Sequence, residues 1–212
     1  MNKINYQKEL DKLLDGIDKE NNDLRLLLHG CCAPCSSYCL VYLSEYFDIT
    51  VLFYNPNIDT ETEYIKREEE LKRFISETSF KHKVDVICAE YNSKEFYDCV
   101  RGFEHFPEGQ DRCFKCYELR MELAAKLAKE NNYDYFCTTL SISPLKNAQK
   151  INEIGMELSE KYGVKWLPSD FKKKNGFKQS VQLSEEHNLY RQNFCGCIFS
   201  KKRKKQNNVV LI

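Results

Sequence analysis

Five short apolar segments alternate with amphipathic segments along most of the chain, and this alternation restricts the possible folds more than any other feature. The apolar segments are typical of buried strands and cover 24–28, 49–54, 84–88, 135–139 and 164–167. Apolar residues at helical spacing predict helices at 5–21, 36–46, 61–78, 93–101, 111–131, 146–162 and around 178–188.

Strands that alternate with helices form right-handed crossovers, and therefore a parallel sheet covered by helices on both faces. The sequence thus predicts an α/β fold: a parallel five-stranded sheet flanked by helices, Rossmann-like or nucleotide-hydrolase-like, in a single layered sandwich. The 212 residues suit one such catalytic domain, expected at 1–200, followed by a basic tail at 201–212. Ligands of such sheets bind beyond the carboxyl ends of the strands, here at 29–35, 55–59, 89–92 and 140–144.

The chain shows no segment that would direct it to a membrane. No apolar run approaches the roughly 18 residues that a membrane-spanning helix needs. The charged N-terminus lacks the apolar core of a signal peptide. We therefore expect a cytoplasmic protein without a membrane partner.

The net charge of zero conceals an acidic first three quarters of the chain and a basic C-terminal quarter. Residues 1–160 sum to −9 and residues 161–212 to +9, with basic runs at 172–174 and 201–205. Such runs bind phosphate backbones, so we expect 170–178 and 201–205 to contact nucleic acid. The alternative is that these runs are only solvated surface.

Eleven cysteines are unusual in a cytoplasmic chain of this length, because a reducing compartment does not support a disulfide framework. Seven of them fall into three groups: Cys31, Cys32 and Cys35; Cys113 and Cys116; Cys195 and Cys197. The other four read as small buried apolar residues: Cys39, Cys88, Cys99 and Cys137.

Grouped thiolates bind soft metals, and the first two groups stand at expected helix N-termini, where the helix dipole stabilises thiolates. The adjacent Cys31 and Cys32 fit one tetrahedral zinc ion poorly, which favours iron–sulfur chemistry. Some of these cysteines could instead be reduced bystanders. Cys195 and Cys197, separated only by Gly196, would form a strained and easily reduced disulfide, or would both bind a metal.

Four ordered motifs extend this pattern over most of the chain: LHGCCAPCSS at 28–37, FYNPNI at 53–58, TTL with SPLKN at 138–147, and YRQNFCGC at 190–197. With the intervening Cys113 and Cys116, the chain resembles the QueH-type, cobalamin-independent epoxyqueuosine reductases from about residue 24 to 200. It departs from the family pattern at Gly30 and at Cys35.

The resemblance implies the last step of queuosine biosynthesis. In that step, two-electron deoxygenation converts the epoxide of epoxyqueuosine, at the wobble position of a tRNA anticodon, to the alkene of queuosine. The resemblance also implies a 4Fe–4S cluster, with Cys31, Cys32, Cys113 and Cys116 as its ligands. Cys195 and Cys197 would then be the catalytic redox pair or the ligands of a second iron.

Polar residues in the expected loops beside this site are candidates for binding the tRNA substrate: Tyr54, Asn55, Thr138, Thr139, Ser143, Lys146, Asn147, Tyr190, Arg191 and Gln192. Each could instead cap a helix or form a turn. Removal of the epoxide oxygen needs a proton source, for which Tyr190 and Asp111 are candidates. A cluster that transfers one electron at a time favours an external donor, ferredoxin-like or flavodoxin-like.

Three other functions compete with this interpretation. A non-catalytic, metal-stabilised RNA-binding protein would also use cysteine pairs and a basic tail. An ATP-using enzyme of the PP-loop kind shares the expected architecture, but its Ser-Gly-Gly-type phosphate loop is absent, because Gly30-Cys31-Cys32-Ala33 stands in its place. A thiol–disulfide oxidoreductase does not need seven grouped cysteines.

Overall fold

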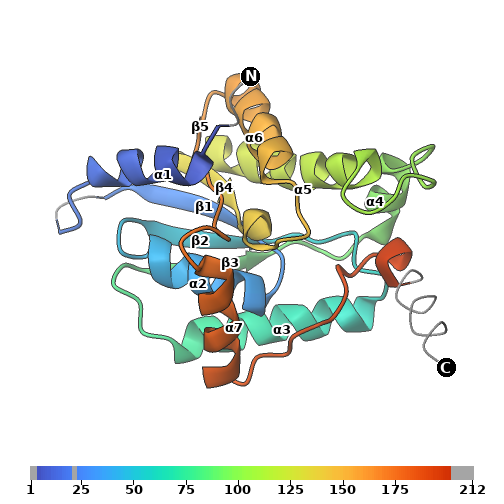
Figure 1. Cartoon of the computed structure of the whole chain (residues 1–212), viewed down its shortest axis with the longest axis horizontal. Coiled ribbons are helices and arrows are strands. Elements are labelled where there is room, and N and C mark those ends of the chain that lie inside the picture. Colours follow the sequence, from blue (N-terminus) through green and yellow to red (C-terminus); the bar gives the residue numbers. More distant parts are fainter. Residues whose placement is uncertain (1–3, 21–22, 202–212) are drawn as a thin grey trace.

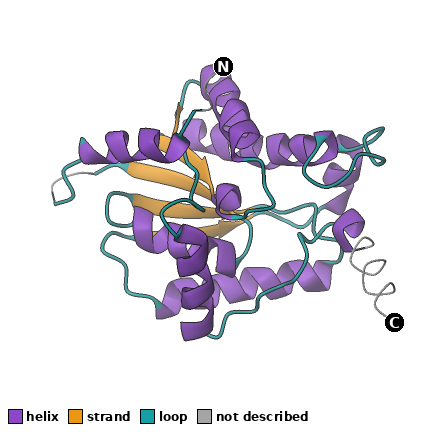
Figure 2. Ribbon diagram, in the orientation of Figure 1, coloured by secondary structure: helices purple, strands orange, loops and turns teal. Residues whose placement is uncertain are grey.

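The computed structural model describes residues 4–20 and 23–201. Its sheet has five parallel strands in the order β3-β2-β1-β4-β5 (Figures 1 and 2). The strands are β1 (Arg25–Gly30), β2 (Asp48–Phe53), β3 (Val84–Cys88), β4 (Tyr135–Thr138) and β5 (Lys165–Trp166). The predicted fold class is therefore confirmed.

Helices cover both faces of this sheet. One face carries α2 (Ala33–Leu43), α3 (Glu61–Glu77) and α7 (Gly176–Glu186), and the other carries α5 (Asp111–Glu130) and α6 (Ala148–Tyr162) (Figure 1). The remaining helices are α1 (Tyr6–Asp15), α4 (Ser93–Cys99) and the 3-10 helix η1 (Thr139–Ile142). Within the described ranges, no helix has the length and apolar character that crossing a membrane requires.

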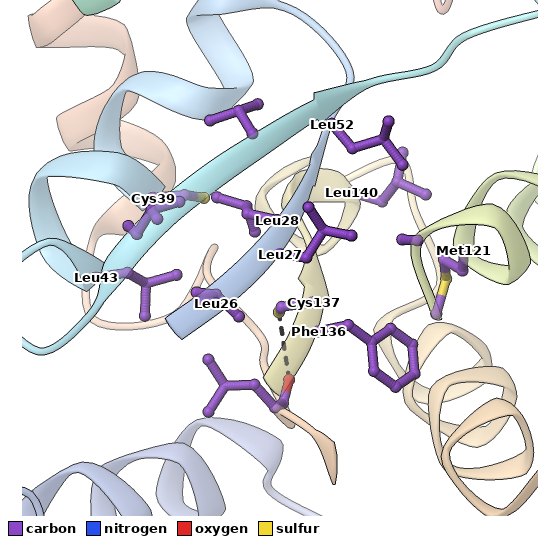
Figure 3. Close-up of a cluster of buried hydrophobic side chains, with 14 of the residues drawn as sticks. Leu26, Leu27, Leu28, Cys39, Leu43, Leu52, Met121, Phe136, Cys137 and Leu140 are labelled. Carbon is purple, nitrogen blue, oxygen red and sulfur yellow. Dashed lines mark hydrogen bonds between the residues drawn. The ribbon is translucent and has the colours of Figure 1, made fainter. Parts of the chain in front are cut away.

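The core lies around the central strand β1. Leu26, Leu27 and Leu28 are fully buried, and they lie with Phe136 of β4 and Met121 of α5 in one apolar cluster (Figure 3). Because a central parallel strand is buried on both faces, β1 reads as a continuous apolar run rather than as an alternating one.

The strand order reverses at β1, since β2 lies on one side of it and β4 on the other. Chain connections leave β1 and β4 toward opposite faces at such a reversal, which opens a crevice at the carboxyl ends of the strands. The residues that follow β1 and β4 therefore lie next to each other, and the backbone N–H of Cys31 donates to Thr139 Oγ1 at 3.3 Å.

Several boundaries differ from the predicted ones. The first helix ends at Asp15 rather than at residue 21, because the N–H groups of Gly16 and Ile17 close its last turn on the carbonyls of Leu13 and Leu14. Helix α2 begins at Ala33, since Pro34 suits the first turn of a helix. The short η1 was not predicted, and β5 is only two residues long. Nearly all of the predicted basic tail, from 202 onward, lies outside the described residues.

Candidate metal and substrate site

A cavity of about 250 Å³ lies at the carboxyl edge of the sheet. Its wall comes from the segments that follow β1, β2 and β4, from α3, α5 and α7, and from residues 191–195 near the C-terminus. Four of its five charged side chains are cationic: Arg67, Arg120, Lys146 and Arg191, against Glu108. The cavity is thus a positively charged site at the place where α/β proteins bind ligands.

Cys31, Cys32 and Cys35 form a group that we call the cysteine triad. Their three sulfur atoms lie within 4.8 Å of one another, and Cys31 Sγ lies 3.8 Å from Cys32 Sγ. Cys35 belongs to the first turn of α2 and Cys32 immediately precedes that helix, so the positive end of the helix dipole faces these sulfurs. Among the described residues, this is the one group of three or more ligand-type side chains at such spacing.

The triad is arranged around one thiolate. Hydrogen bonds from the Cys32 and Cys35 thiols hold the pKa of Cys31 well below its usual value, and Arg120 and Thr139 add to the effect. The same contact with Cys31 raises the pKa of Cys32 to about 12. Thr139 Oγ1 donates to Cys31 Sγ at 3.5 Å. The triad therefore offers a deprotonated sulfur, the form that binds metals.

The other grouped cysteines lie on a second side of the site. Cys116 and Cys197 belong to one small apolar cluster with Phe96 and Val100. A hydrogen bond from the Cys197 thiol holds the pKa of Cys195 well below its usual value, and Lys146 Nζ, which donates to Cys195 Sγ at 3.1 Å, adds to the effect. The predicted set of Cys31, Cys32, Cys113 and Cys116 is therefore not gathered into one group at the spacing of the cysteine triad.

Arg120 links the two sides of the site. Its Nη2 donates to Asn55 Oδ1 at 2.6 Å, its Nε to His29 Nε2 at 3.3 Å, and its Nη1 contacts Cys116 Sγ at 3.9 Å. The side chain is 2% exposed, and no carboxylate of the described part of the chain forms an ion pair with it. Burial and this cation lower the pKa of His29 to about 3, so His29 is neutral. The thiolates near Arg120 are those of Cys31 and Cys195, whose pKa values are lowered, whereas burial raises the pKa of Cys116.

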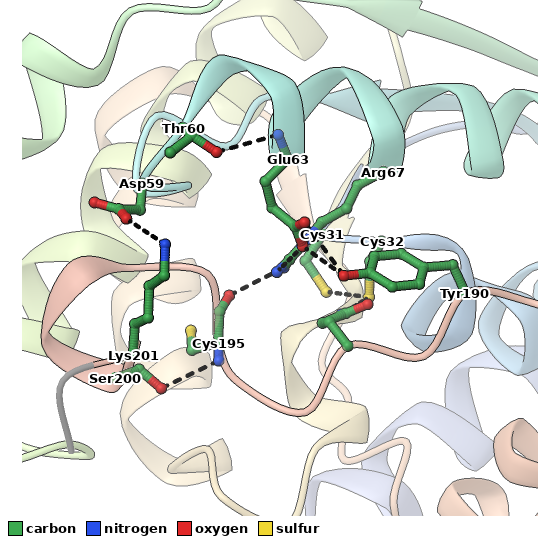
Figure 4. A network of polar contacts seen from close by, with 11 residues as sticks. Cys31, Cys32, Asp59, Thr60, Glu63, Arg67, Tyr190, Cys195, Ser200 and Lys201 are labelled. Atoms are coloured by element: carbon green, nitrogen blue, oxygen red, sulfur yellow. Dashed lines mark hydrogen bonds and ion pairs between the residues drawn. The ribbon is translucent and has the colours of Figure 1, made fainter. Parts of the chain in front are cut away.

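Residues 187–200, which we call the C-terminal segment, return along α3 to reach the cavity (Figure 1). Polar side chains on one face of α3 hold the segment at successive turns (Figure 4). Arg73 donates to the carbonyl of His187, Glu70 accepts from the N–H of Tyr190, and Arg67 Nη1 donates to the carbonyl of Cys195. This path brings Cys195 and Cys197 to the site from the far end of the chain.

Five of the predicted substrate-binding residues line the cavity: Asn55, Ser143, Lys146, Arg191 and Gln192. Gln192 Nε2 donates to Cys32 Sγ at 2.8 Å, which places the C-terminal segment against the cysteine triad. The Oε1 of Gln192 and the Oδ1 of Asn57 are buried without a hydrogen-bond partner among the described residues. Buried oxygens of this kind are candidates to accept hydrogen bonds from a ligand.

Five other predicted residues surround the cavity without lining it. Tyr54 donates to Glu95, and Tyr190 donates to Glu63 at 3.2 Å. Two others cap helices, the alternative considered from the sequence: Thr138 accepts from the N–H of Leu140 at the start of η1, and Asn147 caps α6. Thr139 instead contacts Cys31. Asp111, a predicted proton donor, is exposed at the start of α5 and outside the cavity wall.

The basic run at 172–174 is partly neutralised by carboxylates. Lys172 pairs with Asp170, and Lys174 Nζ lies 2.7 Å from Asp11 Oδ2. Lys173 is exposed, and no ion pair involves it in the part of the chain that is described. Of the predicted run at 201–205, only Lys201 is described, and it pairs with Asp59 at 3.0 Å.

The sequence did not predict Arg120 or Arg67 as residues of the site, and it placed Cys35 in a cysteine group without assigning it as a ligand. Cys35 was left out of the predicted ligand set, although Cys32 and Cys35 have the spacing of a metal-binding pair. Arg120 stands four residues after Cys116, which puts both on one face of α5. Arg67 had no comparable signal, because it is one of many charged residues in α3.

Comparison with known proteins places this site in a family. The sequence profile of the family described as "Epoxyqueuosine reductase QueH" matches residues 26–203. Proteins of that name from Staphylococcus epidermidis and Streptococcus pyogenes are each 43% identical over 202 residues, which cover 93% and 94% of this chain and 85% and 79% of theirs. The Thermotoga maritima protein of that name is 37% identical over 178 residues, covering 82% of this chain and 89% of its own. The chain belongs to the epoxyqueuosine reductase QueH family.

Proposed function

We propose that this chain is an oxidoreductase that converts epoxyqueuosine to queuosine in the wobble position of a tRNA anticodon. The observation that carries the proposal is the position of the cysteine triad in a family of this activity, because Cys31 and Cys35 of the triad line the wall of the cavity. The reaction takes up two electrons and two protons, converts the epoxide to an alkene and releases water. The electrons come from an external ferredoxin-like or flavodoxin-like donor in the cytoplasm.

The side chains around the cavity fit an iron–sulfur centre. The cysteine triad offers closely spaced sulfurs with a thiolate among them, and the buried Arg120 has only sulfurs to balance its charge. Cys31 and Cys32, with Cys113 and Cys116 from α5, would hold a 4Fe–4S cluster, and Cys35 is an additional ligand candidate. Such a cluster supplies electrons one at a time when bound.

Cys195 and Cys197 are proposed as the second redox element, either as a dithiol pair or as ligands of a second iron. Their support is the contact of Cys195 with the cationic Lys146, which stabilises a thiolate beside the cavity. Both roles need a sulfur that is deprotonated and reachable from the cavity. Cys195 is half-buried and lines the cavity wall.

The substrate side of the site is formed by the chain's own polar groups. The cavity is slightly smaller than the roughly 300–1,000 Å³ of most small-molecule sites, which suits a single extruded base with its substituent. Asn57 and Gln192 offer unpartnered oxygens to hydroxyl or amine donors. Lys146 lines the cavity, whereas Tyr190 and Asp111 do not, so Lys146 Nζ is a better-placed proton source than either of them.

The proposal is tested with protein purified without oxygen. We expect a brown protein with iron and sulfide, which converts epoxyqueuosine in tRNA to queuosine when a chemical reductant is supplied. Stoichiometric zinc, no iron and no conversion would instead identify the non-catalytic, metal-stabilised RNA-binding protein.

A further inference from the structure

Two large apolar side chains remain exposed at the border of the cavity. Leu145 is 66% exposed and Phe177 is 38% exposed, and both belong to the cavity wall. Single exposed apolar residues are common on proteins, and Met156, at 41%, is one that lies away from this cavity. Two of them beside a polar and cationic cavity are unusual, and such an arrangement is typical of a binding surface.

The backbone holds Phe177 in a fixed position. It belongs to the first turn of α7, after Asn175 in the left-handed region at φ 63°. A Cβ on Gly176 would meet the Phe171 carbonyl oxygen at 1.9 Å and the Tyr38 ring at 2.5 Å, so only glycine fits there. The start of α7 is therefore tightly packed, and an aromatic ring on it is preorganised for contact.

Leu145 is positioned by a turn on the other chain segment. The N–H of Leu145 donates to Ser143 Oγ at 3.3 Å, and the N–H of Lys146 donates to the Ser143 carbonyl at 3.1 Å. The turn leaves the leucine side chain in solvent, while Lys146 is directed to Cys195. The side chain of Leu145 thus lies at the border of the cavity, next in sequence to the buried Lys146.

The charge around these two side chains points to a polyanion as the occupant. Glu63 pairs with Arg67, and sulfurs lie beside Arg120 and Lys146, so these three cations of the cavity are already balanced. Arg191 lines the cavity and contacts only the neutral Ser180 and Ser184, and Lys173 and Lys178 are exposed close to Phe177 in sequence. No ion pair of the described residues involves Arg191, Lys173 or Lys178. Proteins that bind single-stranded nucleic acid combine such cations with aromatic side chains on which bases stack. A protein partner or a second copy of the chain would not need this excess of positive charge.

We propose that Phe177 and Leu145 form a stacking platform for the nucleotide next to the modified one in a single-stranded RNA loop. This inference rests on the proposed function, because it takes the modified base to occupy the cavity. The cavity has room for one base, so the neighbouring nucleotides stay outside at its border. Phe177 then contacts the face of the adjacent base, and Leu145 covers its edge.

The experiment measures the affinity of the full chain for an unmodified anticodon stem–loop RNA. Because base–aromatic stacking is lost, Phe177→Ala is expected to weaken binding by roughly 5- to 150-fold, whereas Phe177→Trp retains it. Leu145→Ala gives a smaller loss, and Met156→Ala is the matched control without effect. The salt dependence stays unchanged in all of them, because no charge is removed.

A second measurement reports stacking directly. The fluorescence of 2-aminopurine at the position adjacent to the wobble nucleotide changes when the wild-type chain binds, and we expect this change to be absent with Phe177→Ala. A merely structural role of Phe177 would lower thermal stability but would leave the fluorescence change intact in the folded fraction, which would overturn the platform.

Other outcomes separate this inference from the proposed function. Equal RNA affinity of Phe177→Ala and Met156→Ala overturns the platform. So does a defect seen only in turnover with a protein electron donor and not with dithionite, because the apolar pair would then dock the donor. RNA binding that depends on Phe177 in a chain without reductase activity supports the platform and contradicts the proposed reaction. A wild-type chain that binds no RNA overturns both.

Discussion

Two cysteine-bearing regions meet at the cavity, and different kinds of contact hold them there. The cysteine triad directly follows the central strand β1 and enters the first turn of α2, so the hydrophobic core positions its backbone. The C-terminal segment has no strand or helix between α7 and residue 198. Polar contacts with α3 hold it along its length (Figure 4), and Leu189 and Cys197 are the side chains of the segment that join the apolar clusters. The sheet and α2 thus fix the position of the triad, whereas contacts between the C-terminal segment and the rest of the fold fix the positions of Cys195 and Cys197.

The largest effect is expected at the triad. Cys31→Ser removes the thiolate around which the other two sulfurs are arranged, so bound iron should fall to background and turnover by at least about 100-fold. Iron analysis and a turnover assay on the same anaerobic preparation check this. Cys88→Ser, on the edge strand β3, is the matched control, and full iron content in Cys31→Ser would contradict the ligand role.

A separation of metal content from activity is expected at the C-terminal segment. Cys195→Ser should keep most of the iron, because its backbone position is independent of the triad, yet lose turnover by about 100-fold if the sulfur takes part in the redox step. The two quantities are measured in one preparation. Near-normal turnover per folded molecule would assign Cys195 a merely structural role, and loss of the iron would make it a ligand.

A smaller effect is expected when a contact to α3 is removed. Arg67→Met deletes the hydrogen bond to the Cys195 carbonyl, so hydrogen exchange of the amides at 194–197 should accelerate by roughly tenfold while that of β1 is unchanged. Lys72→Met, on the exposed side of the same helix, is the control. Equal acceleration in β1 would show that the segment and the sheet open together.

The smallest effect is expected in the basic run before α7. Lys173→Gln should reduce the slope of log affinity for tRNA against log salt by about 0.7–0.9, the value of one phosphate contact. Lys172→Gln should change the slope less, because Asp170 already pairs with that lysine. Binding titrations at several salt concentrations measure both, and an unchanged slope in Lys173→Gln would identify the run as solvated surface.

The same difference between the two regions explains what could be predicted from the sequence. The apolar runs of β1 and β4 predicted the sheet, and therefore the edge at which Cys31 and Thr139 meet, because burial on both faces leaves a strong local signal. The return path of residues 187–200 has no comparable signal in the sequence. It depends on Glu63, Arg67 and Glu70, which cannot be told from other charged residues of a solvent-exposed helix.

Arg120 was hidden for a related physical reason. In sequence it belongs to a helix rich in Leu, Ala and Lys, where an arginine is expected to point into solvent. Its burial follows from the groups that surround it: Cys116 on its own helix, and Asn55, Cys31 and Cys195 from three other parts of the chain. A buried cation of this kind becomes recognisable only when its partners have been brought together.

The polar face that α3 presents to the C-terminal segment has a consequence for how such sequences can diverge. Glu70 accepts from a backbone N–H of the segment, and Arg67 donates to one of its backbone carbonyls. These two contacts are therefore kept when side chains of the segment change. Glu63 and Asp59 instead meet the side chains of Tyr190 and Lys201. Across related proteins, we expect Glu63 to covary with Tyr190 and Asp59 to covary with Lys201. Arg67 and Glu70 are expected to be conserved even where the sequence of the C-terminal segment changes.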